Sequence, residues 1–496
     1  MAHETTASAS QRRDEDLGSA VPGAAMSARA AISLEANSGS AFVRKLASRL
    51  DPVKIPRGHT FSWNAFLGSR RVPGHVPTLG IITNMLSKTR MQDLSAVFFD
   101  QIHPTYGFVD KQELLLQIES RWSAPECGAA YDALLCSIAA LGCLFSQVHA
   151  DSLEQDLLET ARALLGQTMS EVPDVRTITA SLLRAVYLRI AGTHYEAWMA
   201  SCMVMHMIEA AGVTADVHAK STWSSSTDTA RRLVLIAQHL NIWMSFDMGL
   251  TRVALNSAEN IPMPLPRSGD FTPEITALLA LSVDLDPERK PTAEELEIAL
   301  HALMSRVHST PPTILAQCNL ALCLCRRLRS LEAVLTETIL QGILTLTTNG
   351  VAAARSILAA RAPWHHMAYV PFQIVCVLLA IDTVSSISQL RDAMQCLKDI
   401  SLVYDTQATQ EALSTARSLV RLHQKGKEIF AAALDDVLKD TSEASSAEHA
   451  NTTSLTSGTE ELASIFAADF PGLGDFDMET LLNPDFFWNA GSYGIS

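Results

Sequence analysis

Adjacent histidines and adjacent aspartates are the residue pairs in this chain whose chemistry would suit catalysis or metal binding. Two neighbouring imidazoles point in different directions, and no carboxylate ligand motif lies near His365 and His366, so we expect a polar helix start there. His206 lies in a Met-rich apolar stretch and is expected to be a satisfied core histidine. Asp435-Asp436 lacks the DDxxD pattern of Asp-rich metal motifs. The motifs GxGxxG, GxSxG, HExxH and the Walker phosphate loop do not occur, and we predict that the protein is not an enzyme.

The cysteines could bind zinc only at suitable spacing, and they do not have it. Cys323 and Cys325 are two residues apart and therefore point to different sides of a helix, and no CxxC occurs. Nearly all cysteines have apolar neighbours, which predicts reduced, buried thiols in a reducing compartment. We expect no metal and no other cofactor in this chain. The nine cysteines are at positions 127, 136, 143, 202, 318, 323, 325, 376 and 396.

The end of the chain has a composition suited to binding a partner. Residues 440–496 contain ten acids and neither Lys nor Arg, with aromatic residues interleaved. Charge repulsion keeps such a segment expanded and leaves its aromatic side chains available to dock in a partner's hydrophobic groove, as in a transcriptional activation segment. The alternative is a final helix that packs on the domain through Leu462, Ile465, Phe466, Leu481 and Leu482. The activation residues that we predict are Phe466, Phe470, Phe476, Leu481, Leu482, Phe486, Phe487 and Trp488.

A basic segment lies near the other end. Residues 41–90 contain nine basic residues, one acid and four prolines, which predicts an irregular and partly extended linker. It could contact DNA phosphates or serve in nuclear import. The alternative is a solvated linker, because the segment has neither a basic helix nor a metal site to enter a groove. The contacts that we predict are Arg44, Lys45, Arg49, Arg70 and Arg71.

The net charge of −15 over 496 residues argues against a protein whose whole surface binds nucleic acid, until the charge is divided by segment. Residues 1–40 carry −2, residues 41–90 carry +8, residues 91–439 carry −11 and residues 440–496 carry −10. Residues 1–40 are of low complexity and are expected to be disordered, like the acidic tail. No secretory signal is seen and the apolar runs are too short to cross a bilayer, so we expect a protein that is soluble, not secreted and without a membrane partner.

Helical periodicity governs residues 91–439, and no segment alternates long enough to predict a sheet. The fold class that we predict is all-α, a multi-helix regulatory bundle with disordered N-terminal and C-terminal segments. Residues 198–208 are apolar on most sides, as in a helix at the centre of a bundle. Further helices are predicted at about 229–247, 292–306, 312–345, 350–361, 369–398 and 407–438.

Several stretches, taken together and in order, resemble the middle homology region of fungal binuclear-zinc-cluster transcription factors, the fungal-specific transcription factor domain. The resemblance covers roughly residues 42–425. Pro104 should end the helix that holds Phe98 and Phe99, with His103 at its end. Arg184 and Arg189 should pair with acids of the bundle, and Trp198 should anchor the core. The stretches are FVRKL to FSWNAF at 42–66, FFDQIHPTYGFVD at 98–110, TASLLRAVYLRIAGTHYEAWMASCMVMHMIEAAGV at 179–213, ARRLVLIAQHLNIWMSFDMGL at 230–250 and YVPFQIVCVLLAIDTVSSISQLRDAM at 369–394.

The resemblance implies a nuclear regulator, an activator of RNA polymerase II genes that controls a fungal secondary-metabolite gene cluster. Its partners would be the transcription machinery or a coactivator, promoter DNA, and a second copy or a DNA-binding regulator. The sequence departs from the family in one respect, because the first cysteine is Cys127 and the six-cysteine zinc cluster is absent. A missing first exon, a lost DNA-binding function, or a borrowed DNA-binding domain would each explain this. The alternatives are a co-regulator without direct DNA binding and a helical small-molecule-binding protein.

Overall fold

The computed structural model describes residues 42–43, 45–47, 64–124, 128–214, 225–255, 261–286, 289–331 and 333–447 of the chain. Side chains at 225–226 and 440–447 are outside this description. Every named element in the described part is a helix, and the one β-bridge there joins Arg267 to Asp270. The prediction of an all-α fold is confirmed.

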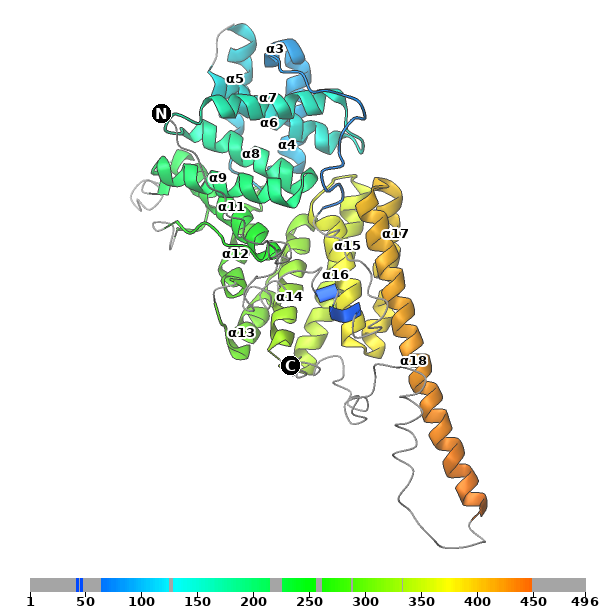
Figure 1. Ribbon diagram of the computed structural model, residues 1–496. Coiled ribbons are helices and arrows are strands. Elements are labelled where there is room, and N and C mark those ends of the chain that lie inside the picture. The colour runs from blue at the N-terminus through cyan, green and yellow to red at the C-terminus, as the bar shows by residue number, and fades with distance from the viewer. Residues whose placement is uncertain are drawn as a thin grey trace, which may run out of the picture.

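The first group of helices surrounds α6 (Ala129–Ser146), which is the most apolar of them (Figure 1). Helix α6 is long and apolar enough to cross a membrane, but 78% of it is buried between α4, α7 and α8, as in a core helix. Gly142 permits the close crossing with α4, since a Cβ there would lie 2.5 Å from the Leu94 carbonyl oxygen. The other helices of this group are α3 (Ile82–Met85), α4 (Lys88–Gln101), α5 (Lys111–Ser123), α7 (Ser152–Gln167), α8 (Val175–Ala191) and α9 (His194–Ala210).

The second group packs around α14 and α16, with α11 passing between the two groups (Figure 1). Helix α16 is buried along its whole length. Helix α18 docks on α16 and α17 and then projects from the body (Figure 1). The elements are α11 (Ser225–Met248), α12 (Thr272–Ser282), the 3₁₀ turn η1 (Val283–Leu285), α13 (Ala293–Met304), α14 (Pro311–Ser330), α15 (Glu337–Ala359), α16 (His366–Ile381), α17 (Val384–Tyr404) and α18 (Gln407–Ala447).

Two long helices predicted from periodicity are each two helices. The prediction at 312–345 is wrong because α14 ends at Ser330 and Thr336 starts α15 as an N-cap that accepts a hydrogen bond from the Ile339 amide. The prediction at 369–398 is wrong because Asp382 takes a left-handed conformation with φ of 54°, and Thr383 then caps α17. In both places the apolar spacing continues across a break that local capping produces.

The described part of the basic segment is irregular between residues 64 and 81, as predicted. Residues 64–66 and Arg70 are buried in the body, whereas residues 71–81 are mostly exposed. The Asn64 amide donates to the carbonyls of Arg189 and Gly192, at 3.2 and 3.0 Å. The Phe66 ring packs edge-on against Tyr404 with centroids 5.7 Å apart. Residues 64–70 therefore join the end of α8 to the end of α17, and α3 begins before the predicted domain boundary at residue 91.

Helix α9 lies at the edge of the molecule and not at its centre. It packs on α8 and α11, which leaves its outer face in solvent (Figure 1). Tyr195, Met199 and Met203 are 63%, 41% and 40% exposed. His206 follows them on this face and is exposed, so the prediction of a core histidine is wrong. Trp198 is partly buried, and its indole donates to the Ser245 hydroxyl at 3.1 Å.

The eight described cysteines are all free thiols, and seven of them are buried, as predicted. Burial raises the pKa of every one of them. For Cys323 the pKa rises to about 11, because burial outweighs the nearby Arg326. Such thiols remain protonated at neutral pH.

Candidate functional site

Arginine–carboxylate pairs fasten the loops of the bundle to its helices. Arg232 on α11 is fully buried, and its guanidinium donates to Asp228 one turn away, at 2.8 Å, and to Asp270. Asp228 also accepts from Arg267 at 2.6 Å and from the Leu265 amide at 2.9 Å. These bonds hold the proline-rich segment 261–270 against the start of α11. Their arrangement saturates both carboxylates and explains the position of the loop without a catalytic role.

A second pair has a similar role in joining two helices. Arg189 on α8 donates to Asp247 on α11 at 2.8 Å, which confirms the predicted pairing of Arg189 with an acid of the bundle. Burial raises the pKa of Asp247, although Arg189 opposes this effect. Arg184 makes no ion pair with the described residues, so its predicted pairing is wrong there. His103 donates a hydrogen bond from Nε2 to the Val109 carbonyl at 2.8 Å, and thereby fixes the loop after α4 instead of the helix end.

Three histidines and two tryptophans form a buried cluster between α11 and the start of α16. His239 and Trp243, one turn apart on α11, have ring centroids 4.7 Å apart. Trp243 lies 5.6 Å from His366, and His366 lies 4.1 Å from His365. Trp364 precedes them and packs edge-on against aromatic rings of the first group of helices. The prediction of a polar helix start is wrong, because both histidines are buried, with 5% and 4% of their surface exposed.

The histidine–tryptophan cluster is electrically neutral at physiological pH. Burial lowers the pKa of His365 and His366 well below its usual range, and the charge of nearby Arg189 lowers it further. The pKa of His239 falls to about 3 for the same two reasons. Within the described part of the chain, one nitrogen of each histidine and the Trp243 indole nitrogen are buried without a hydrogen-bond partner. Each such group costs about 1–3 kcal/mol unless water satisfies it.

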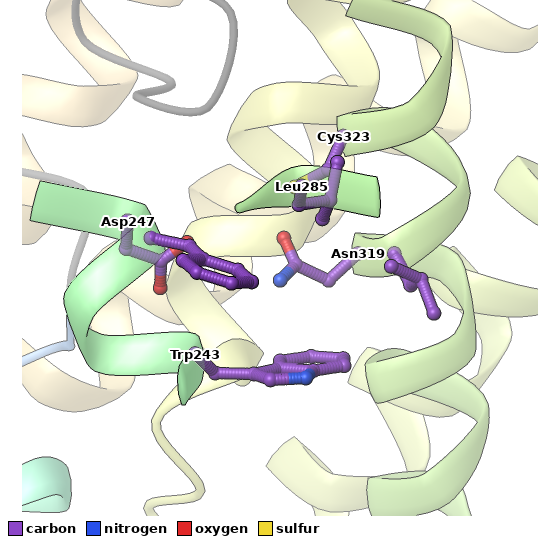
Figure 2. Close-up of a pocket in the computed structure, with 7 residues that line it drawn as sticks. Trp243, Asp247, Leu285, Asn319 and Cys323 are labelled. Carbon is purple, nitrogen blue, oxygen red and sulfur yellow. The ribbon is translucent and has the colours of Figure 1, made fainter. Parts of the chain in front are cut away.

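Two small cavities adjoin this cluster and have room for water that could supply the hydrogen-bond partners. Figure 2 shows one of them, where the Trp243 indole from α11 and the Asn319 amide from α14 project into the same space, with Asp247, Leu285 and Cys323 around it. The second is lined by Tyr106, Trp364 and the three histidines, among others. Each has room for about one water molecule. They suit buried water that completes the hydrogen bonding of the cluster, and they hold no paired nucleophile and base.

Of the predicted DNA contacts that the structure describes, one is buried and two are exposed. The prediction for Arg70 is wrong, because its guanidinium is buried in a bidentate ion pair with Glu154 at 2.7 and 2.8 Å, and Glu154 also accepts from the Tyr187 hydroxyl. Arg71 and Lys45 are exposed. Arg44 and Arg49 lie outside the described residues. The eight predicted activation residues, Phe466, Phe470, Phe476, Leu481, Leu482, Phe486, Phe487 and Trp488, also lie outside them.

The described residues do not fit a zinc cluster. Throughout the described ranges, no three His, Cys, Asp or Glu side chains come together in a way that could hold a metal ion. The described thiols are dispersed over α6, α9, α14, α16 and α17, where burial keeps them protonated. No chemistry of the described residues is therefore assigned to zinc.

The sequence did not predict the two buried polar features, which are the ion network around Arg232 and the histidine–tryptophan cluster. One signal for the ion network was available, since Arg231 and Arg232 stand together at the head of an otherwise apolar helix. The histidine–tryptophan cluster joins residues more than one hundred positions apart, from α11 and α16, and no short motif marks it.

Comparisons with known proteins agree with the resemblance noted in the sequence. Residues 96–323 match the profile of the fungal specific transcription factor domain. Protein RDR1 of Gibberella zeae is 50% identical over 412 residues, which cover 82% of this chain and 75% of that protein. Transcription factor kojR of Aspergillus oryzae is 38% identical over 403 residues, which cover 80% and 72%. Protein RDR1 of Saccharomyces cerevisiae is 28% identical over 79% of this chain and 72% of its own length. On these matches, the chain belongs to the fungal-specific transcription factor family.

Proposed function

We propose that this transcriptional regulator works in the nucleus as an activator of RNA polymerase II genes, through the acidic and aromatic tail at 440–496. Membership of the family makes the chain a regulator of transcription and not an enzyme. The observation that carries the activator role is the composition of the tail, ten acids interleaved with aromatic residues and no basic residue. Its partner would be a coactivator or the transcription machinery, bound through a hydrophobic groove.

A reporter assay tests the tail directly. Residues 440–496 are fused to an unrelated DNA-binding domain, and transcription of a reporter gene is measured. We expect activation that falls at least about tenfold when Phe486, Phe487 and Trp488 become Ala, because aromatic anchors supply most of the binding energy of such interfaces. A matched control replaces Asn451, Thr452 and Thr453 with Ala and should retain full activity. An inactive fusion, or equal loss in both variants, would contradict the proposal.

We further propose that the regulated genes form a secondary-metabolite cluster, as the resemblance implies. RNA sequencing of a strain without the gene, against the parent and a complemented strain, tests this proposal. We expect transcripts of one contiguous set of biosynthetic genes to fall and to recover on complementation. Scattered changes without such a set would contradict it.

Contact with promoter DNA, direct or through a partner regulator, is the remaining part of the proposal. Arg71 and Lys45 remain exposed in the basic segment, whereas Arg70 is buried in an ion pair. Binding to duplex DNA is measured at several salt concentrations, because phosphate contacts weaken steeply as salt rises. Salt-dependent binding that decreases in Arg71→Ala supports direct contact. Absence of binding at every salt concentration supports a co-regulator that acts through another protein, and genomic DNA upstream of Met1 is then read for a six-cysteine exon.

A further inference from the structure

Helix α18 consists of a docked half and a projecting half. Ala412, Ala416 and Leu419 are buried against the body. His423 binds Asp382 at the end of α16, at 3.0 Å, and Lys427 binds the same carboxylate. Beyond Lys427 the helix projects away from the body as far as Ala447 (Figure 1).

The apolar face of the docked half continues along the projecting half. Gly426, Ile429, Phe430, Ala433 and Leu434 follow the same helical spacing, and we call these five residues the distal stripe. Ile429 and Leu434 are 38% and 45% exposed, and Val437 and Leu438 extend the face at 45% and 66%. Within the described part of the chain, Ile429, Phe430 and Leu434 are not packed against the core, and no atom lies within 4 Å of a Cβ built on Gly426. A helix with a continuous exposed apolar face is stabilised by a partner that covers it.

The charges of α18 are divided along the helix. Residues 412–427 carry four basic residues and no acid, whereas residues 428–443 carry five acids and one lysine. Two copies placed antiparallel would bring the basic turns of each beside the acidic turns of the other. Parallel copies would set like charges together, at a cost.

We propose that α18 binds a second copy of this chain, antiparallel, through the distal stripe. In the register that centres the pair between Ala431 and Ala432, Phe430 lies level with Ala433 of the second copy and Gly426 lies level with Val437 of the second copy. A large side chain then faces a small one in both layers, and Ile429 meets Leu434 of the second copy. This arrangement places the two bodies at opposite ends of the helix pair, and each acidic tail leaves close to the body of the other copy.

The molar mass of the full chain in solution tests the proposal. Sedimentation equilibrium over a range of concentrations should show a species of about twice 53.8 kDa. Ala433→Glu places a charge in the distal stripe and should weaken the association at least about tenfold. Ala432→Glu is the matched control, since a side chain one residue away is turned by about 100° around the helix and points away from the distal stripe, and it should associate as the wild type does. Circular dichroism and thermal unfolding show whether both variants fold.

Charge reversal tests the direction of the pairing. Lys425→Glu makes the acidic variant and Asp436→Lys makes the basic variant, since in this register Lys425 lies within one turn of Asp436 of the second copy. Each should associate more weakly alone than the wild type, and an equimolar mixture of the two should restore the dimer. Self-association of either variant that is as strong as that of the wild type would overturn the proposal, since parallel helices set like charges together both before and after the reversal.

Three further outcomes would also overturn it. The first is a chain that is monomeric at all concentrations, as it would be if its own tail covered the distal stripe. The second is a dimer that Ala433→Glu leaves intact. The third is an equal loss of the dimer in Ala432→Glu and Ala433→Glu.

Discussion

The head of α11 and the middle of the same helix bury polar side chains in opposite ways. At the head, Arg232 and Asp228 are charged, and hydrogen bonds to Asp270, Arg267 and the loop backbone saturate them. Three turns further on, His239 and Trp243 are neutral and face other rings and cavities of about one water each. Buried charge at the start of α11 is therefore tied to matching charge, whereas the imidazoles of the histidine–tryptophan cluster stay neutral. The two regions should respond differently to substitution and to acid.

The largest effect on stability is expected from removing the buried charge at the start of α11. Arg232→Leu leaves the Asp228 and Asp270 carboxylates without their buried partner, and we expect a loss of about 5 kcal/mol in the free energy of unfolding. Urea unfolding followed by circular dichroism measures it. A loss below about 1 kcal/mol would mean that the loop rearranges to hydrate the two acids.

Two neighbouring arginines give a matched version of the same test. Arg70→Ala removes a buried guanidinium from Glu154 and should cost about 3 kcal/mol, whereas Arg71 is exposed and Arg71→Ala should cost less than about 0.5 kcal/mol. Urea unfolding of both variants gives the two values. Equal costs would contradict the assignment of Arg70 to the interior.

Acid should destabilise the protein through the neutral histidines of the histidine–tryptophan cluster. The pKa of His365 and His366 is lower in the folded state than in the unfolded chain, so below the unfolded value near 6.5 the unfolded state binds more protons and stability falls. Between pH 7 and pH 5, each histidine that stays neutral should cost about 2 kcal/mol. Thermal unfolding at both pH values should show a smaller fall for His366→Phe than for the wild type.

The exposed His206 provides the control for this measurement. His206→Phe replaces an exposed histidine of α9 outside the buried cluster, and its fall in stability between pH 7 and pH 5 is compared with that of His366→Phe. If His206→Phe and His366→Phe reduce it equally, the buried cluster is not the source of the acid sensitivity.

The smallest effect is expected where a charge pair lies at the surface. Arg355 donates to Asp392 at 3.1 Å, but the two side chains are 41% and 69% exposed. Water and salt screen this pair, so Arg355→Ala should cost less than about 1 kcal/mol. A cost near that of Arg232→Leu in the same urea experiment would show that burial does not separate the two kinds of pair.

The helices were largely predictable from the sequence, and the interior contacts were not. In α8 and α11 the apolar residues recur every three or four positions, which is the period of an α-helix, so both helices could be located in the sequence. Spacing carries no information about which apolar face meets another, and α9 was therefore expected at the centre although it lies at the edge. Contacts such as Arg70 with Glu154 and Trp243 with His366 depend on how distant helices pack. The tail prediction rests on composition alone, and it stays a prediction.

The buried cysteines can report local unfolding of the helices around them. A thiol held in its protonated form and shielded by packed helices reacts with an alkylating reagent only after the surrounding helices separate. The seven buried thiols in the described part lie on α6, α14, α16 and α17, so together they label four helices of the body. The order in which they become alkylated under mild denaturation would rank the helices by the free energy of local opening.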